Sequence, residues 1–135
     1  MVPRFFADET DLSLGKALEA AHPGEVVYPG HADLPEVPRR SLDDEWLPVI
    51  GRLQLVVVTR DKNIRYRTVE RLLWIEHQVR GFVLTGRSSQ STVESLQIIE
   101  ENWHRISTVI DDRPKGPWMY TVTKGGLRDK RLDPM

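Results

Sequence analysis

The amino-acid sequence predicts an α/β fold built on a parallel, doubly wound sheet. Short apolar runs alternate with segments of helical periodicity along the chain, which is the order of strand–helix–strand units. The segment Leu53–Thr59 contains an unbroken apolar run, as expected of a central parallel strand covered on both faces. A length of 135 residues with 39% hydrophobic residues suffices for one core and leaves little room for a second domain.

The first strand and helix are predicted from the N-terminal residues. Residues 4–7 form a short strand that ends at Asp8. Thr10 or Asp11 can cap a helix that continues to about Ala21, before "HPG" stops it.

The next segment leads into the central strand. "EVVYPG" is a second brief strand, and the proline-rich residues 29–40 form a loop. Ser41 and Asp44 match a capping box at the start of a short helix, which Gly51 can end.

The second half continues the alternation to a fifth strand. A helix over residues 66–78 is predicted from the apolar spacing of Val69, Leu72, Leu73 and Val79. "GFVLTG" is a strand, and "PWMYTVT" is the last strand before a basic tail that starts at about residue 124. The helix between them, over residues 89–105, places one apolar stripe at Val93, Leu96, Ile99, Trp103 and Ile106.

Composition limits the classes of site and the location of the protein. Without cysteine there is no disulfide or thiolate site, so any metal must be bound by oxygen or imidazole. Apolar runs far shorter than about twenty residues exclude a membrane span, and the N-terminus has no signal-peptide pattern, which favours the cytoplasm. The histidines share no ligand spacing and the tryptophans suit core packing, so both types are interpreted as structural or surface residues: His22, His31, His77 and His104, and Trp46, Trp74, Trp103 and Trp118.

Charge is unevenly distributed although the net charge is only −1. Residues 1–45 hold ten acids against four Lys or Arg, whereas residues 60–87 hold seven Lys or Arg against three acids. Residues 113–135 hold six Lys or Arg against two acids. Such blocks are either ordinary solvated surface or an acidic metal centre beside a basic surface for a polyanion.

Carboxylates are predicted to gather at the carboxyl ends of the strands, where ligands bind in open parallel sheets. Asp8 and Glu9 follow the first strand, Asp61 follows the central strand, and Asp43 and Asp44 start the helix that leads into it. Crowded carboxylates repel one another unless a cation neutralises them, and Mg²⁺ or Mn²⁺ prefers oxygen ligands. Alternatively, Asp43 and Asp44 are favourable acids at a helix N-terminus, and Asp61 caps a turn or the next helix.

Basic residues follow the central strand directly. Such side chains could neutralise the phosphates that flank a scissile bond in a nucleic acid, a contact that is largely blind to base sequence. A metal ion at the acidic residues could then activate a water for phosphodiester hydrolysis. The candidate phosphate-binding residues are Arg60, Lys62, Arg65 and Arg67.

The stretches "FFADE", "DDEWLPVIGR" and "LVVVTRDKNI" together resemble the PIN-like ribonuclease domains, in particular the compact branch that includes VapC-type toxins of toxin–antitoxin pairs. The resemblance implies a three-layer α/β/α sandwich around a mainly parallel sheet of four to five strands. It also implies metal-dependent RNA cleavage and an antitoxin partner that covers the active site. Asp8, Asp43 and Asp61 are carried over as catalytic metal ligands, with Glu9 and Asp44 as further candidates.

The chain departs from the family pattern in one respect. Many members place an additional Glu on a helix between the first two Asp residues, but here a proline-rich loop occupies that interval. Glu9, Glu36 or Glu45 could take its place, or a water could be the fourth ligand.

Two other functions remain open. One is a non-catalytic PIN-like module that binds RNA or protein. The other is a phosphorelay receiver domain, in which Asp8 with Glu9, Asp61, Thr85 and Lys124 would form the phosphorylation site, although Lys124 lies too far from Thr85 for a simple strand–helix–strand step. Homodimerisation through apolar helix stripes is a further expectation.

Overall fold

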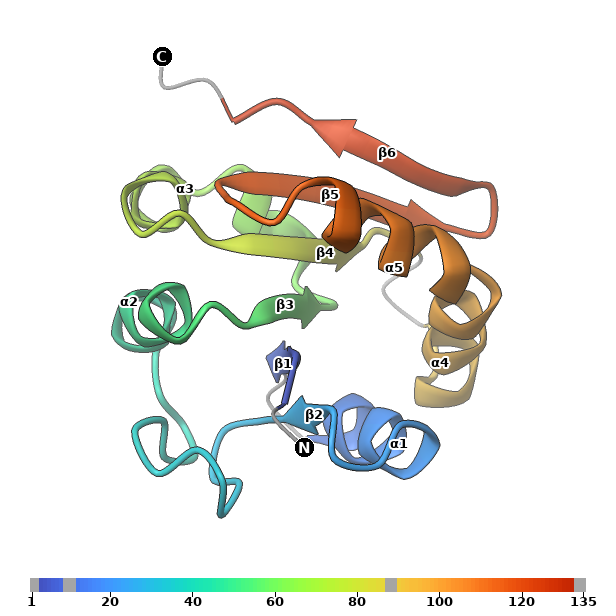
Figure 1. Ribbon diagram of the computed structural model, residues 1–135, viewed down its shortest axis with the longest axis horizontal. Helices are drawn as coiled ribbons and strands as arrows, with labels where there is room; N and C mark the ends of the chain where they lie inside the picture. Colours follow the sequence, from blue (N-terminus) through green and yellow to red (C-terminus); the bar gives the residue numbers. More distant parts are fainter. Residues whose placement is uncertain (1–2, 9–11, 87–89, 133–135) are drawn as a thin grey trace.

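A computed structural model describes residues 3–8, 12–86 and 90–132. These residues contain one six-stranded sheet with the order β2-β1-β3-β4-β5-β6. Neighbouring strands are parallel except for β6, which pairs antiparallel with β5 (Figure 1). The strands are β1 (Phe5–Asp8), β2 (Val26–Val27), β3 (Val56–Thr59), β4 (Arg80–Leu84), β5 (Trp118–Thr123) and β6 (Gly126–Lys130).

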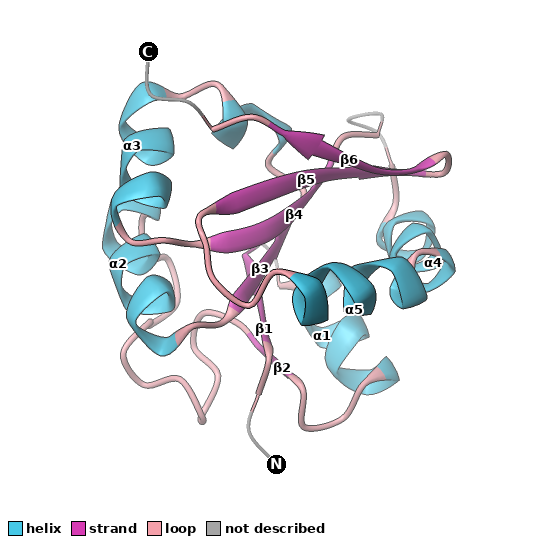
Figure 2. Ribbon diagram, turned by 45° about the horizontal axis from the view of Figure 1, so that its top comes forward, coloured by secondary structure: helices cyan, strands magenta, loops and turns pink. Residues whose placement is uncertain are grey.

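Helices cover both faces of this sheet. On one face lie α1 (Ser13–Ala21), α4 (Thr92–Glu101) and α5 (Trp103–Asp112), and on the other lie α2 (Asp43–Leu53) and α3 (Thr68–Glu76) (Figure 2). A short 3₁₀ helix, η1 (Lys62–Arg65), connects β3 to α3. The predicted α/β fold is therefore confirmed as a three-layer arrangement.

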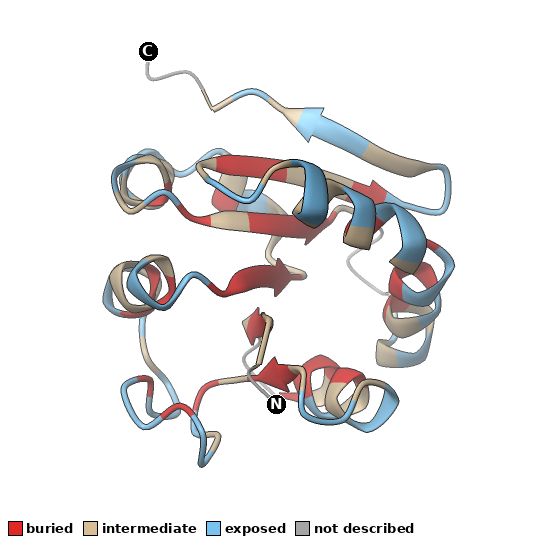
Figure 3. Ribbon diagram, in the orientation of Figure 1, coloured by how far each residue is buried: buried red, intermediate tan, exposed pale blue. Residues whose placement is uncertain are grey.

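Two apolar cores lie on opposite faces of the sheet, and the central strand contributes to both (Figure 3). Val56 and Val58 pack with α1, α4 and α5, whereas Val57 packs with α2 and α3. All three side chains are at most 2% exposed. This explains why the run reads as uniformly apolar rather than alternating.

The sheet has six strands instead of the four to five expected, because the basic tail predicted from about residue 124 contains a strand. The chain reverses after β5 at Gly126, whose φ of 123° is readily adopted only by glycine. Residues Gly126–Lys130 then pair with Thr123–Met119 along the sheet edge. Exposed charged residues on a short strand are a common way to protect such an edge, which is why this segment resembled a tail.

The helix predicted over residues 89–105 is two helices, and Ser89 lies outside the described residues. The first helix starts after Ser91, whose hydroxyl accepts a hydrogen bond from the Glu94 amide at 3.1 Å. The break falls at Asn102, which is 1% exposed. Its side-chain amide donates to the carbonyls of Ile98 at 2.8 Å and Thr123 at 3.2 Å, so a tertiary contact holds the turn between α4 and α5.

The start and the end of α2 also differ from the prediction. The Ser41 hydroxyl donates to the Pro38 carbonyl, and the Glu45 carboxylate accepts from the Leu42 amide at 2.7 Å, so the Ser41–Asp44 capping box is wrong. Gly51 does not end the helix. It lies inside α2, where a Cβ would collide with the His77 carbonyl, so glycine here allows close packing against the end of α3.

The apolar spacing predicted for residues 66–78 identifies the helix but not its buried side. Val69 and Leu72 are 61% and 51% exposed. Trp74 instead anchors α3, because it is fully buried and its indole N–H donates to the Trp118 carbonyl at 3.1 Å. Gly81 leaves room for this ring, since a Cβ there would lie 2.7 Å from the Trp74 ring.

We predict that Gly81→Ala destabilises the fold by about 1–3 kcal/mol, because the added methyl overpacks the contact between β4 and Trp74. Urea unfolding followed by fluorescence measures this loss. Gly125→Ala is the matched control, since its Cβ would approach the nearest atom no closer than 3.6 Å. Equal stability of the two variants would contradict the packing argument.

Candidate functional site

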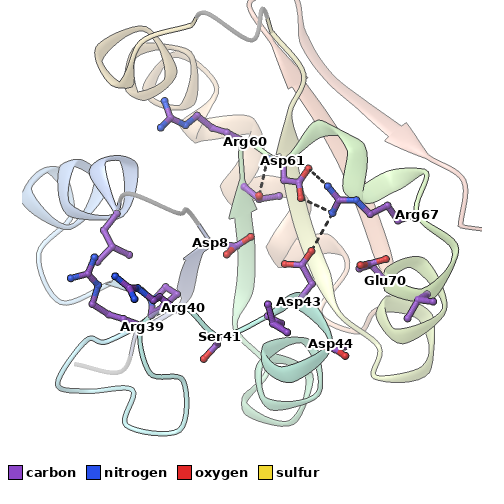
Figure 4. A pocket seen from close by; sticks show the side chains of 15 residues that line it. Asp8, Arg39, Arg40, Ser41, Asp43, Asp44, Arg60, Asp61, Arg67 and Glu70 are labelled. Carbon is purple, nitrogen blue, oxygen red and sulfur yellow. Dashed lines mark hydrogen bonds and ion pairs between the residues drawn. The ribbon is translucent and has the colours of Figure 1, made fainter.

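A cleft of about 1240 Å³ lies at the carboxyl ends of β1 and β3 (Figure 4). The chain passes from β1 to β2 on one side and then to β3 on the other, so this is the switch point where open parallel sheets bind ligands. The charged residues that line the cleft are Asp8, Arg39, Arg40, Asp43, Asp44, Arg60, Asp61, Arg67 and Glu70.

Asp8 is the last residue of β1 and pairs in register with Thr59 of β3. Within the described parts of the chain, no group donates a hydrogen bond to its carboxylate. The pKa of Asp8 is raised to about 7, mainly by burial and then by the negative charges of Asp43 and Asp61, against a smaller lowering by Arg67. Asp8 therefore holds its proton far more readily than an ordinary aspartate.

Asp43 is the first residue of α2, and its carboxylate points into the cleft (Figure 4). It accepts a hydrogen bond from the Trp46 indole N–H at 3.1 Å, and Trp46 is itself fully buried against Phe6. Burial is the main reason that the pKa of Asp43 is raised, and the negative charge of Asp61 raises it as well. The hydrogen bond from Trp46 acts in the opposite direction and lowers this pKa. The core thus orients this carboxylate directly.

Asp61 both caps a short helix and lines the cleft. Its side chain accepts a hydrogen bond from the Asn63 amide at 3.3 Å and so caps η1. The same carboxylate lines the cleft, and its own backbone N–H donates to the hydroxyl of buried Thr59 at 3.0 Å. The end of β3 and the start of η1 therefore position it together.

Arg67 lies between two of these acids (Figure 4). Its Nη1 donates to Asp61 Oδ2 at 2.8 Å and to Asp43 Oδ2 at 3.2 Å, and its Nη2 donates to Asp61 Oδ1 at 3.1 Å. The hydrogen bonds to Asp61 hold the pKa of Arg67 above its usual value. This guanidinium is the cation that offsets the repulsion between the acids.

The carboxylates of the cleft are the kind of ligand that a hard divalent ion prefers, but they are not arranged as a preformed metal site. Carboxylates of Asp8, Asp43 and Asp61 face one space, and oxygen ligands suit Mg²⁺ or Mn²⁺. Yet among the described residues no group of three acidic or histidine side chains is arranged to hold a metal ion. Since Arg67 binds two of these carboxylates, a metal that used all three would have to displace it from at least one.

The structure places the remaining acidic candidates differently. Asp44 lines the cleft but is exposed, and Glu9 lies outside the described residues. Glu45 caps α2, and Glu36 is exposed and does not line the cleft. No described residue takes the place of the additional Glu of the family pattern on the interval between Asp8 and Asp43.

Sequence reasoning missed three charged residues of the cleft. Glu70 follows Arg67 by three residues, a spacing that places both on one side of a helical turn and could have drawn attention to it. Arg39 and Arg40 come from the proline-rich loop between β2 and α2, and no local pattern marks them.

The four basic residues predicted to bind phosphate fall into two groups. Arg60 and Arg67 line the cleft. Lys62 and Arg65 lie beside it on η1, where Arg65 Nε donates to the Lys62 carbonyl at 2.8 Å. Arg67 is engaged with carboxylates in this structure, and its role toward phosphate stays a prediction.

Most of the histidines and tryptophans have structural contacts, as expected. His22 stacks on Trp103 with ring centroids 3.7 Å apart and contacts Glu100 at 2.6 Å. His31 contacts Glu19 at 2.5 Å. Trp46, Trp74 and Trp118 are core residues.

Comparison with known proteins identifies one family. Residues 3–86, more than half of the chain, match a family model described as "PIN like domain". The match spans β1 to β4 and includes Asp8, Asp43 and Asp61. Neither the curated proteins nor the solved structures yield a match. No helix in the described ranges is long and apolar enough to cross a membrane.

We predict that Asp8→Asn reduces the pH dependence of stability. The unfolded chain loses the Asp8 proton near 3.8 whereas the folded chain keeps it to about 7, so this group lowers the free energy of unfolding as pH rises between those values. The loss of free energy of unfolding that Asp8 causes over this pH range is at most about 4 kcal/mol. Urea unfolding of both proteins from pH 4 to pH 8 in chelator-treated buffer measures the difference, and parallel curves would contradict it.

We predict that Arg67→Gln lowers the free energy of unfolding by about 1 kcal/mol, because the guanidinium is 41% exposed and water screens the pairs it forms. The loss should shrink in an Asp61→Asn background, where its main partner is uncharged. A double-mutant cycle of urea unfolding at pH 7.5 tests this, and additive effects would show that the pair makes no contribution.

Proposed function

Because the chain belongs to the PIN-like domain family, we propose that it is a metal-dependent endoribonuclease that hydrolyses phosphodiester bonds of RNA. The observation that carries this proposal is the approach of Asp8, Asp43 and Asp61 from three separate elements to one cleft. Three carboxylates are costly to hold together, and their convergence suits a site that binds a cation.

Asp8, Asp43 and Asp61 would hold the ion, Mg²⁺ or Mn²⁺. When bound, such an ion polarises a phosphate and lowers the pKa of a bound water. Trp46 and Thr59 act as positioning residues. The Trp46 indole N–H donates to the Asp43 carboxylate, and the Thr59 hydroxyl accepts from the backbone N–H of Asp61. Arg60, Arg39 and Arg40, which line the same cleft, would bind the phosphates that flank the scissile bond.

The biological role that we propose is that of the toxin in a toxin–antitoxin pair, with an antitoxin protein as its partner. This role rests on the resemblance of the sequence to VapC-type toxins, whose antitoxin covers the active site. A cytoplasmic location and a homodimer remain predictions.

A non-catalytic PIN-like binding module is the second candidate, and one observation favours it. Arg67 binds both Asp43 and Asp61, which leaves no ready three-carboxylate metal site among the described residues. The receiver alternative has less support, because Thr85 and Lys124 follow β4 and β5 but do not line the cleft.

We predict that the wild-type chain cleaves RNA only with Mn²⁺ or Mg²⁺, and that Asp43→Asn or Asp61→Asn lowers the rate at least about 100-fold, since loss of even a supporting group of a metal site costs 10- to 100-fold. Cleavage of labelled RNA on denaturing gels measures this. A toxin should also arrest growth when expressed, and Asp61→Asn should relieve the arrest.

Asp112→Asn is the matched control, because Asp112 is an exposed carboxylate at the end of α5, on the sheet face opposite α2 and α3. It should cleave at the wild-type rate. If the Asp61→Asn variant still cleaves RNA, Asp61 has no part in the mechanism. If the wild-type chain cleaves no RNA at any metal concentration, the non-catalytic binding module is the function that stands.

A further inference from the structure

We propose that Tyr66, Arg65 and Lys130 form a binding surface for single-stranded RNA beside the acidic cleft. These three residues are called the Tyr66 platform. The proposal rests on the proposed function, because it takes RNA as the substrate. It adds the place beside the acidic cleft where the RNA strand binds. Lys130 belongs to β6, outside the residues that match the family model.

The geometry of the platform joins two distant segments of the chain. Tyr66 lies between η1 and α3 and is 61% exposed. The Arg65 guanidinium carbon lies 4.6 Å from the centre of the Tyr66 ring, and Lys130 Nζ lies 5.2 Å from it. Two cations and an exposed ring are thus gathered at one place by tertiary folding.

The positive charge of this platform is not balanced by acids. Within the described ranges, neither Arg65 nor Lys130 forms an ion pair with a carboxylate. Arg113, which directly follows α5, differs, because it pairs with the Asp129 carboxylate at 3.1 Å and donates to the Tyr120 hydroxyl at 3.0 Å. Two cations that lie against one exposed ring without a carboxylate partner favour a polyanionic ligand.

Hydrogen bonds hold the platform in place. Arg65 Nε donates to the Lys62 carbonyl at 2.8 Å, which directs the guanidinium over the ring. Arg71 of α3 donates to the Arg131 carbonyl at 3.1 Å and so ties the end of β6 to α3. The surface is therefore formed before any ligand arrives.

The platform adjoins the cleft along the chain, because Arg67, which lines the cleft, is the next residue after Tyr66. The Arg67 guanidinium binds Asp43 and Asp61. A strand that contacts the platform with one nucleotide would bring a neighbouring phosphate to the aspartates.

The chemistry favours a single strand over a duplex or a protein. Unpaired bases stack on aromatic rings with little sequence preference, while nearby Lys and Arg bind the phosphates. In a duplex the bases are already stacked on one another and do not offer their faces. Lys130 needs only to move off the ring face to contact a phosphate, because an exposed cation–π contact is weak.

The test is fluorescence anisotropy of a labelled 12-nucleotide oligouridine with the full chain in EDTA, so that cleavage does not interfere. Tyr66→Ala should raise Kd about 5- to 100-fold through lost stacking, whereas Tyr66→Phe should bind as the wild type does. Lys130→Ala should raise Kd and reduce the salt dependence by about one phosphate contact.

Lys124→Ala is the matched control, since Lys124 is an exposed lysine at the other end of the same hairpin. It should leave Kd and the salt dependence unchanged. Unchanged binding in Tyr66→Ala and Lys130→Ala, equal competition by duplex RNA, or an absence of binding by the wild type would each overturn the proposal.

These outcomes are separable from the fate of the proposed function. If the variants lose binding but the wild type cleaves nothing with Mn²⁺, the platform stands and the nuclease fails. If the wild type cleaves and the variants bind normally, the nuclease stands and the platform is wrong.

Discussion

Repulsion among carboxylates is the constraint on which the rest of the site depends. Asp8, Asp43 and Asp61 share one partly buried space, and burial with mutual repulsion raises the pKa of Asp8 and Asp43. Arg67 relieves part of this repulsion by binding Asp43 and Asp61 together. The site is thus held in a state that depends on one internal cation, and a ligand that supplies positive charge would compete with that arginine.

Buried elements of the fold hold these acids in place against their mutual repulsion. The buried valines of β3 lead into Thr59, whose hydroxyl accepts the Asp61 amide hydrogen, and the buried ring of Trp46 donates to Asp43. Asp43 and Asp61 therefore come from elements that are anchored in the apolar cores. Rigid strand ends and helix starts position charged groups more accurately than free loops can.

The C-terminal hairpin adds a surface that the matched family region does not contain. Strand β6 covers the edge of β5 and ends at Lys130, next to Tyr66. Lys130 is consequently placed beside Tyr66, the residue before Arg67, instead of on a separate tail. The cations of the Tyr66 platform can therefore attract a polyanion that the carboxylates of the cleft alone would repel.

The sequence by itself determined the strand–helix alternation, the buried central strand and the three aspartates at one sheet edge. Those features follow from local periodicity and from the rule that parallel strands bring their carboxyl ends together. Only the tertiary structure decided that Arg67 binds Asp43 and Asp61, that Glu70, Arg39 and Arg40 line the cleft, that Asn102 divides a helix, and that β6 pairs with β5. The contacts of Arg67 with Asp43 and of Asn102 with Thr123 join residues more than twenty positions apart, and local sequence carries no signal for such contacts.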